Sequence, residues 1–118
     1  MRLTQRKGDI AVSQAIATFT RMGYDTLIPI TESSPYDLVI DANNNLFRVQ
    51  VKFTSDKNGD VDLRNIHSNS SGYVVKKQKN NSYDWLYILQ SDGQEFLIKE
   101  CLSDRRSVRM NSQYLIND

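Results

Sequence analysis

The stretch from Tyr36 to Thr54 constrains the fold more than any other part of this sequence. Two apolar-rich segments, residues 36–41 and 46–53, flank Ala42-Asn43-Asn44-Asn45, and asparagine tolerates the left-handed backbone that tight turns require. In the second segment apolar and polar residues alternate over positions 47–54, which is the period of a β-strand. The sequence therefore predicts a β-hairpin with one apolar face and one polar face.

Three polar residues of this hairpin have the chemistry of a divalent-cation site. Asp37 lies on the first strand, whereas Gln50 and Lys52 are two positions apart and leave the second strand on one face. A carboxylate and an amide oxygen are hard ligands that suit a divalent cation. Lys52 beside such an ion is suited to lower the pKa of a bound water or to offset charge on a phosphate. An ordinary hairpin with three solvent-side polar residues has the same spacing, so the pattern alone leaves both interpretations open.

A resemblance to a known family favours the first interpretation. Pro35-Tyr36-Asp37, followed by a hairpin and Arg48-Val49-Gln50-Val51-Lys52, resembles the PD-(D/E)xK nuclease signature in its variant with Gln at the second acidic position. Gly8-Asp9-Ile10-Ala11, Met22-Gly23-Tyr24 and Leu27-Ile28-Pro29 precede this motif. The whole order is similar to the group I intron-encoded homing endonucleases, and more distantly to archaeal Holliday-junction resolvases.

The resemblance covers residues 5–54, with weaker support over residues 83–89, and it implies both a fold and an activity. The fold implied is restriction-endonuclease-like, an α/β architecture whose mixed central β-sheet is flanked by helices in an αβββαβ-type core. The activity implied is that of a homing-type endonuclease, which hydrolyses phosphodiester bonds in double-stranded DNA. Its cofactor would be Mg²⁺ or Mn²⁺, held by Asp37, Gln50 and the backbone carbonyl of Val51. Asp37, Gln50 and Lys52 would be the catalytic residues.

The chain departs from the family pattern at one position. In the resembled family a helical acid four residues after the glycine completes the metal site, but here that residue is Val12. Asp9, close to one turn earlier, is a candidate substitute ligand. The departure leaves open a catalytically weakened or inactive DNA-binding or assembly module of the same fold. An α/β interaction domain in which the Asp-Gln-Lys geometry is accidental is a third hypothesis.

Length and charge limit how such a protein could hold DNA. At 118 residues we expect a single nuclease-like domain over residues 1–118, and a net charge of +1 does not by itself indicate a nucleic-acid partner. Contacts with phosphates must then come from local clusters of basic residues. The predicted DNA-binding residues are Lys7, Arg48, Lys76, Lys77 and Lys79.

Cysteine content and hydropathy indicate the compartment. A single cysteine, Cys101, cannot form an intramolecular disulfide, and no apolar run approaches the ~20 residues of a membrane span. The N-terminal residues 1–7 lack the apolar region of a secretory signal. We therefore expect a cytoplasmic protein in a reducing, intracellular setting, with no membrane partner.

Hydrophobic periodicity predicts most of the remaining elements. The expected elements are a helix over residues 4–22 ending at Gly23, strands over 26–30 and 61–64, a flexible loop over 67–72, and a strand over 85–89 in a hairpin with 95–99. Residues 73–77 fit either a strand or the opening of a second helix.

Assembly follows from the proposed reaction. One site per chain predicts at least a dimer if both strands of a duplex are cut, so we expect a dimer or tetramer. Tyr114, Leu115 and Ile116 are the candidate assembly surface.

Overall fold

The structure is a computed structural model, and it describes residues 3–63, 65–69, 72–76, 82–102 and 105–116. The described residues form one α-helix, a series of short β-strands and one 3₁₀-helix. In chain order these are α1 (Leu3–Arg21), β1 (Asp25–Leu27), β2 (Leu38–Ala42), β3 (Asn45–Thr54), β4 (Asp60–Asp62), β5 (Asn65–Asn69), β6 (Gly72–Lys76), β7 (Trp85–Gln90), β8 (Glu95–Ile98), β9 (Ser107–Arg109) and η1 (Ser112–Tyr114).

The helix α1 forms where the apolar period predicts it. Ala11, Ala15 and Phe19, spaced four residues apart, are fully buried, so one face of the helix packs on the sheet. Gly23 follows the helix with φ of +91°, and the N–H of Tyr24 donates to the carbonyl of Phe19 at 3.0 Å. This is the arrangement in which a left-handed residue ends a helix, and glycine adopts it without steric cost.

The predicted hairpin is also present, as β2 and β3. Asn43 and Asn44 have φ of 56° and 70°, so asparagine supplies the left-handed turn between the strands. The register places Ala42 opposite Asn45 and Leu38 opposite Val49. The second strand, β3, continues to Thr54, well beyond the start of β2.

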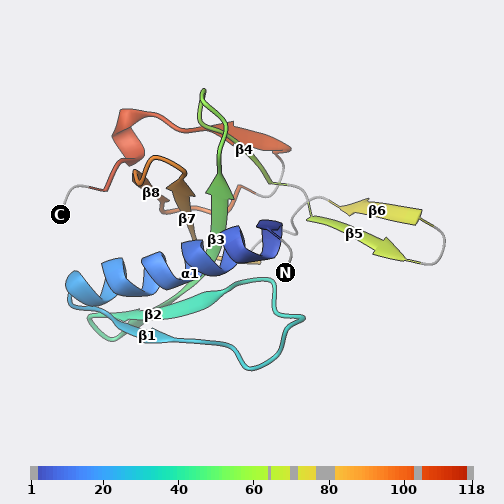
Figure 1. The fold of residues 1–118 in the computed structure, drawn as a ribbon. Helices are drawn as coiled ribbons and strands as arrows, with labels where there is room; N and C mark the ends of the chain where they lie inside the picture. The colour runs from blue at the N-terminus through green and yellow to red at the C-terminus, as the bar shows by residue number, and fades with distance from the viewer. Residues whose placement is uncertain (1–2, 64, 70–71, 77–81, 103–104, 117–118) are drawn as a thin grey trace.

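The strand β3 lies in the middle of the central sheet. Within the described residues this sheet has five strands in the order β1-β2-β3-β7-β8. The pair β3–β7 is parallel and the other pairs are antiparallel, which makes the sheet mixed. Figure 1 shows α1 lying across the sheet in front of β3. The predicted α/β class and mixed sheet are confirmed, and the apolar run at residues 85–89 is a central strand as expected.

Two apolar cores cover the two faces of this sheet. The helix-side core lies under α1 and consists of Ala11, Ala15, Phe19, Leu38, Ile40, Val49, Val51, Trp85, Tyr87 and Leu89. The far-side core consists of Val61, Leu63, Tyr83, Leu86, Ile88, Phe96, Ile98, Leu102, Val108 and Met110. Val61 and Val108 pair across the small antiparallel sheet β4–β9, so this sheet covers the far face.

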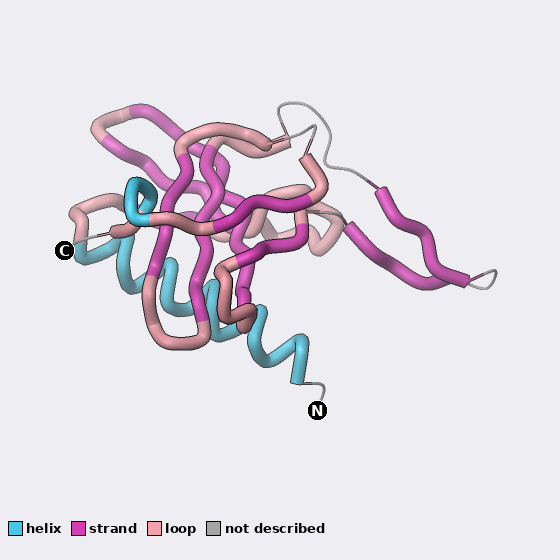
Figure 2. The backbone as a smooth tube through the Cα atoms, turned by 90° about the horizontal axis from the view of Figure 1, so that it is seen from above, coloured by secondary structure: helices cyan, strands magenta, loops and turns pink. Residues whose placement is uncertain are grey.

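The segment after β4 differs from the sequence prediction. Residues 65–69 and 72–76 pair as the antiparallel hairpin β5–β6, where we expected a loop over 67–72 and then a strand or a second helix. The prediction of a loop is therefore wrong. This serine- and asparagine-rich segment lacks the alternation of apolar and polar residues by which a strand is identified in a sequence. Figures 1 and 2 both show this hairpin projecting away from the central sheet. In the described residues the sheet is therefore flanked by one α-helix, with the small sheet β4–β9 on the other face.

The predicted assembly surface is packed within the chain itself. Tyr114 and Leu115 are half-buried against the far-side core, and Ile116 is half-buried against the helix-side core. The Ile116 N–H donates to the Glu95 carbonyl at 2.9 Å, so the C-terminal segment closes the end of β8. These residues anchor the C-terminal segment on the chain's own cores, and their role in assembly stays a prediction.

Candidate active site

The candidate site lies where β2 stops pairing with β3. The Asp37 N–H donates to the Val49 carbonyl at 2.9 Å, and Asp37 Oδ2 accepts the N–H of Val51 at 2.9 Å. A side-chain carboxylate therefore takes the position that the backbone of a longer β2 would occupy. Pairing between the two strands ends at Asp37, and we call the place where it ends the opening.

A backbone carbonyl faces the same opening. Along an edge of a strand, N–H and C=O groups of every second residue point to the same neighbour, and in β3 the odd-numbered residues point toward β2. The carbonyl of Val51 is thus directed to the side on which Asp37 lies. Within the described part of the chain, Asp37 Oδ1 has no hydrogen-bond partner. Both oxygens are placed to bind a ligand at this opening.

Gln50 and Lys52 project from the far face of β3. In the parallel pair β3–β7, Gln50 lies opposite Leu86 and Lys52 lies opposite Ile88. Leu86 and Ile88 both belong to the far-side core. The two polar side chains are half-buried at the margin of that core. Among the described residues the Gln50 carboxamide makes no hydrogen bond, so it remains available to a ligand.

Burial opposes the charge on both Asp37 and Lys52. It raises the pKa of the Asp37 carboxyl, against the opposing effects of the Val51 N–H and of the Lys52 ammonium. It lowers the pKa of Lys52, against the attraction of Asp37 and of Asp62. Interacting titratable groups whose pKa values are shifted in opposite directions by burial are typical of functional sites. A divalent cation would offset the cost of the Asp37 charge.

The helical residues of the predicted site lie elsewhere. Val12 is half-buried against the helix-side core, which is the opposite face of β3 from Gln50 and Lys52. Asp9 is exposed on α1, and no contact joins it to Asp37 or Gln50 in the described residues. The structure thus brings Asp37, Val51 and Lys52 together but does not add Asp9 to them.

Three of the five predicted DNA-binding residues lie within the described residues. The Lys7 Nζ lies 5.6 Å from the centroid of the Phe53 ring, next to the end of β3. Arg48 is paired with Asp84, its Nε 3.1 Å from Oδ2. Lys76 ends β6. The two further residues, Lys77 and Lys79, lie outside the described residues.

Two acidic residues near the site were not identified from the sequence. Asp84 precedes β7, and its Oδ2 accepts the N–H of Arg48 at 2.8 Å, on the β7 side of β3. Asp62 on β4 acts electrostatically on Lys52. A carboxylate directly before a buried apolar run was the available signal for Asp84, whereas Asp62 reaches Lys52 only through the tertiary fold.

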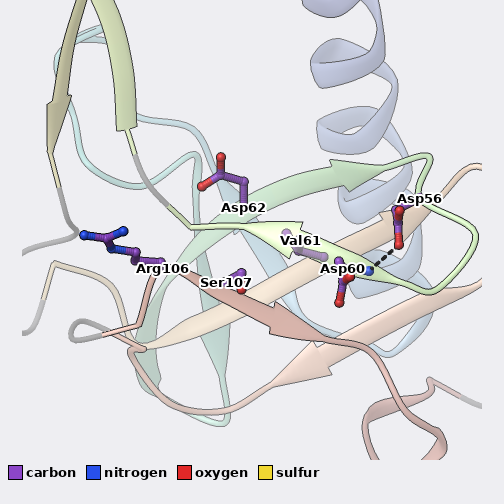
Figure 3. A pocket seen from close by; sticks show the side chains of 6 residues that line it. All are labelled: Asp56, Asp60, Val61, Asp62, Arg106 and Ser107. Carbon is purple, nitrogen blue, oxygen red and sulfur yellow. Dashed lines mark hydrogen bonds between the residues drawn. The ribbon is translucent and has the colours of Figure 1, made fainter.

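A surface pocket lies beside β4 and β9, next to this region. Figure 3 shows the side chains that line it, which are Asp56, Asp60, Val61, Asp62, Arg106 and Ser107. Asp56 Oδ2 accepts the backbone N–H of Asp60 at 3.1 Å, so Asp56 stabilises the turn before β4. Asp62 lies at the other end of β4 from that turn.

The donor set suits a hard divalent cation. The predicted ligands are all oxygen atoms. The Asp37 carboxylate and the Val51 carbonyl lie on the β2 side of β3, and the Gln50 amide projects from the far face of the same strand. In the described residues no group of three or more His, Cys, Asp and Glu side chains is placed to hold a metal ion. A cation here would therefore depend on amide and carbonyl oxygens, on water and on substrate phosphate as well as on carboxylate.

Comparison with known proteins identifies the class. A model of the PD-(D/E)XK endonuclease family matches residues 2–111, nearly the whole chain. The chain therefore belongs to the PD-(D/E)XK endonuclease family, and its fold is similar to that of a homing endonuclease.

One solved structure is similar over almost the full length. It is that of I-Ssp6803I, a bacterial homing endonuclease, with 26% sequence identity and a TM-score of 0.78 over 94% of this chain and 80% of that one. No curated protein sequence matches this chain significantly. No described helix is both long enough and apolar enough to cross a bilayer.

Proposed function

We propose that this chain is a homing-type endonuclease that hydrolyses phosphodiester bonds of double-stranded DNA with the aid of Mg²⁺ or Mn²⁺. The observation that carries the proposal is the opening between β2 and β3, where Asp37 is bound to the Val51 N–H and interacts with Lys52. Family membership and the similarity to a homing endonuclease support it. The reaction would take place in the cytoplasm.

Each residue of the site has a role that its position allows. Asp37 Oδ1, the Gln50 amide oxygen and the Val51 carbonyl would hold the cation. When bound, such an ion supplies electrostatic stabilisation of phosphate charge and lowers the pKa of a bound water. Lys52 would place its ammonium against the negative charge that develops on the attacked phosphate, at a partly dehydrated position where such an interaction is strong.

The reaction geometry requires more than one copy. One chain carries one such site, so cutting both strands of a duplex needs a dimer or tetramer, and a two-fold axis favours a near-palindromic target. Lys7, whose Nζ lies 5.6 Å from the centroid of the Phe53 ring near the end of β3, would contact a DNA phosphate.

A nicking assay tests the proposal. Supercoiled plasmid incubated with the protein and Mn²⁺ is expected to become open-circular, and Lys52→Met is expected to slow this roughly 100-fold or more, because a charge that stabilises the transition state is lost. Lys57→Met, at an exposed turn position, is the matched control and should cleave normally. Cleavage that persists in Lys52→Met would contradict the assignment.

A second candidate function is a catalytically weakened or silent DNA-binding module. The observation that favours it is Val12, an apolar residue packed into the helix-side core at the position of the family's helical acid. In the same assay this candidate predicts that DNA is retained at low salt, in a salt-sensitive manner, without any cleavage.

A further inference from the structure

We propose that the hairpin β5–β6 is a DNA-recognition ribbon, which lies in the major groove of the duplex and helps to select the target sequence. This inference rests on the proposed function, since it assigns recognition of the same substrate to an element separate from the candidate active site. Four properties of the hairpin support it: its shape, the charge and composition of its segment, its dimensions, and the place where it leaves the core.

The hairpin is a two-stranded ribbon that lies apart from the rest of the fold. Its strands pair from Asn65 opposite Lys76 to Asn69 opposite Gly72. Figures 1 and 2 both show it projecting from the body that α1 and the central sheet form. Among the described elements, β5 and β6 make extensive contacts only with each other. A two-stranded hairpin alone is at best marginally stable in water, so such a ribbon gains stability from a partner on which it packs.

The segment that carries the ribbon is basic, although the whole chain is nearly neutral. Residues 63–83 contain four basic residues, Arg64, Lys76, Lys77 and Lys79, and no aspartate or glutamate. The formal net charge of this segment is +4, so the remaining 97 residues carry −3 of the chain's total of +1. An anionic polymer is the partner whose charge complements such a segment.

The uncharged residues of the segment favour DNA over a second copy of the chain as the partner. Residues 65–81 include four asparagines, one glutamine and three serines, whereas the large apolar or aromatic residues in this range are Ile66, Tyr73, Val74 and Val75. Amide side chains bind base edges, adenine above all, and serine hydroxyls bind phosphates. Interfaces between permanent subunits are more apolar than this.

The dimensions of the ribbon match the major groove. A strand rises about 3.4 Å per residue, so strands of this length extend over roughly 17 Å. The major groove of B-DNA is about 12 Å wide and admits a two-stranded β-ribbon. The minor groove is only about 6 Å wide, which is too narrow for two paired strands with their side chains.

Both ends of the hairpin are anchored on the far-side core. Leu63, before the hairpin, and Tyr83, after it, are each 1% exposed and belong to that core. The Tyr83 hydroxyl accepts the Leu102 N–H at 3.1 Å, which fixes the returning chain. The same core contains the β7 residues that lie opposite Gln50 and Lys52. The ribbon is therefore anchored on the face of the central sheet from which Gln50 and Lys52 project.

Selection of bound duplexes from a random-sequence pool, without divalent cations, tests this inference. The wild type is expected to select a motif and to bind it about 100-fold or more tightly than unrelated duplex. A variant with residues 65–76 replaced by Gly-Ser-Gly is expected to lose at least about tenfold of this ratio. At saturating protein with Mn²⁺ it should still nick plasmid within about threefold of the wild-type rate, because Asp37, Gln50 and Lys52 lie outside the hairpin.

Point variants keep the test valid if the shortened variant does not fold, which circular dichroism checks. Asn65→Ala combined with Asn69→Ala leaves the charge unchanged and is expected to lower the ratio about tenfold without changing the salt slope. Asn58→Ala, at an exposed position in the turn before β4, is the matched control and should select the wild-type motif. Methylation of guanine N7, in the major groove, should interfere with wild-type binding at the positions that the variants no longer select.

The outcomes separate this inference from the proposed function. Variants that select the wild-type motif with the wild-type ratio would overturn the role of the hairpin while DNA cleavage still stands. Loss of the motif together with dissociation of a wild-type oligomer in sedimentation would also overturn it, since the hairpin would then join two copies. A wild-type protein that neither binds nor nicks DNA would overturn both proposals.

Discussion

Asp37 and Lys52 are charged residues whose side chains are half-buried in the folded chain. Burial raises the pKa of Asp37 and lowers the pKa of Lys52, and in each case it outweighs their mutual attraction. Both charges therefore reduce the stability of the folded chain near neutral pH. Charged residues that lower the stability of the fold and lie at a surface opening are typical of functional sites.

The sign of the Lys52 shift gives a prediction for stability. The folded state binds the Lys52 proton less readily than the unfolded state, whose pKa is 10.5, so its contribution to stability is lowest below the folded pKa and recovers as pH rises toward 10.5. At pH 7, Lys52→Met is expected to raise the Tm by a few degrees, and this gain should shrink at alkaline pH. Thermal unfolding followed by circular dichroism measures both, with Lys57→Met as the control. A lower Tm at pH 7 would show that Lys52 stabilises the fold.

At the scale of elements, the Asp84 carboxylate binds Arg48 where the parallel pair β3–β7 begins. Asp84 Oδ2 accepts the backbone N–H and Nε of Arg48, at 2.8 and 3.1 Å, and Oδ1 accepts Nη2 at 3.2 Å. The Asp84 N–H in turn donates to the Arg48 carbonyl at 2.8 Å. Asp37 on one edge of β3 and Asp84 on the other thus satisfy backbone groups that neighbouring strands leave unpaired.

The ion pair with Asp84 changes the role that we expect for Arg48 in DNA binding. Its charge is already neutralised by Asp84, so Arg48→Ala should lower the free energy of unfolding by about 1 kcal/mol, given that the pair is one-third exposed. The salt dependence of DNA binding should change little. Lys7→Ala should instead reduce the salt slope by about one with little effect on stability. Chemical denaturation and DNA binding at several salt concentrations separate the two, and a loss of slope in Arg48→Ala alone would contradict this assignment.

The elements differ in how far the sequence predicts them. The β2–β3 hairpin and β7 are predictable because alternation, an asparagine turn and a continuous apolar run are local signals. The β5–β6 hairpin is not, since its first strand, Asn65–Asn69, has no apolar period. Asp37, Gln50 and Lys52 are close in sequence and belong to one motif. Asp62 and Asp84 reach β3 only because separate strands pack beside it, which no local pattern indicates.

At the scale of the whole molecule, one chain presents one candidate site on a nearly neutral protein. The net charge of +1 means that DNA binding depends on where basic residues lie, and among the described residues Lys7 lies beside β3. The C-terminal residues expected to join two copies are instead packed on the chain's own cores.

The position of a bound Mn²⁺ ion tests the central claim most directly. In crystals grown with Mn²⁺, anomalous scattering is expected to show a peak within coordination distance of Asp37 Oδ1 and the Val51 carbonyl, beside Gln50. The peak should vanish in crystals of Asp37→Asn. A peak at another place in the wild type, or one that persists beside residue 37 in that variant, would contradict the account.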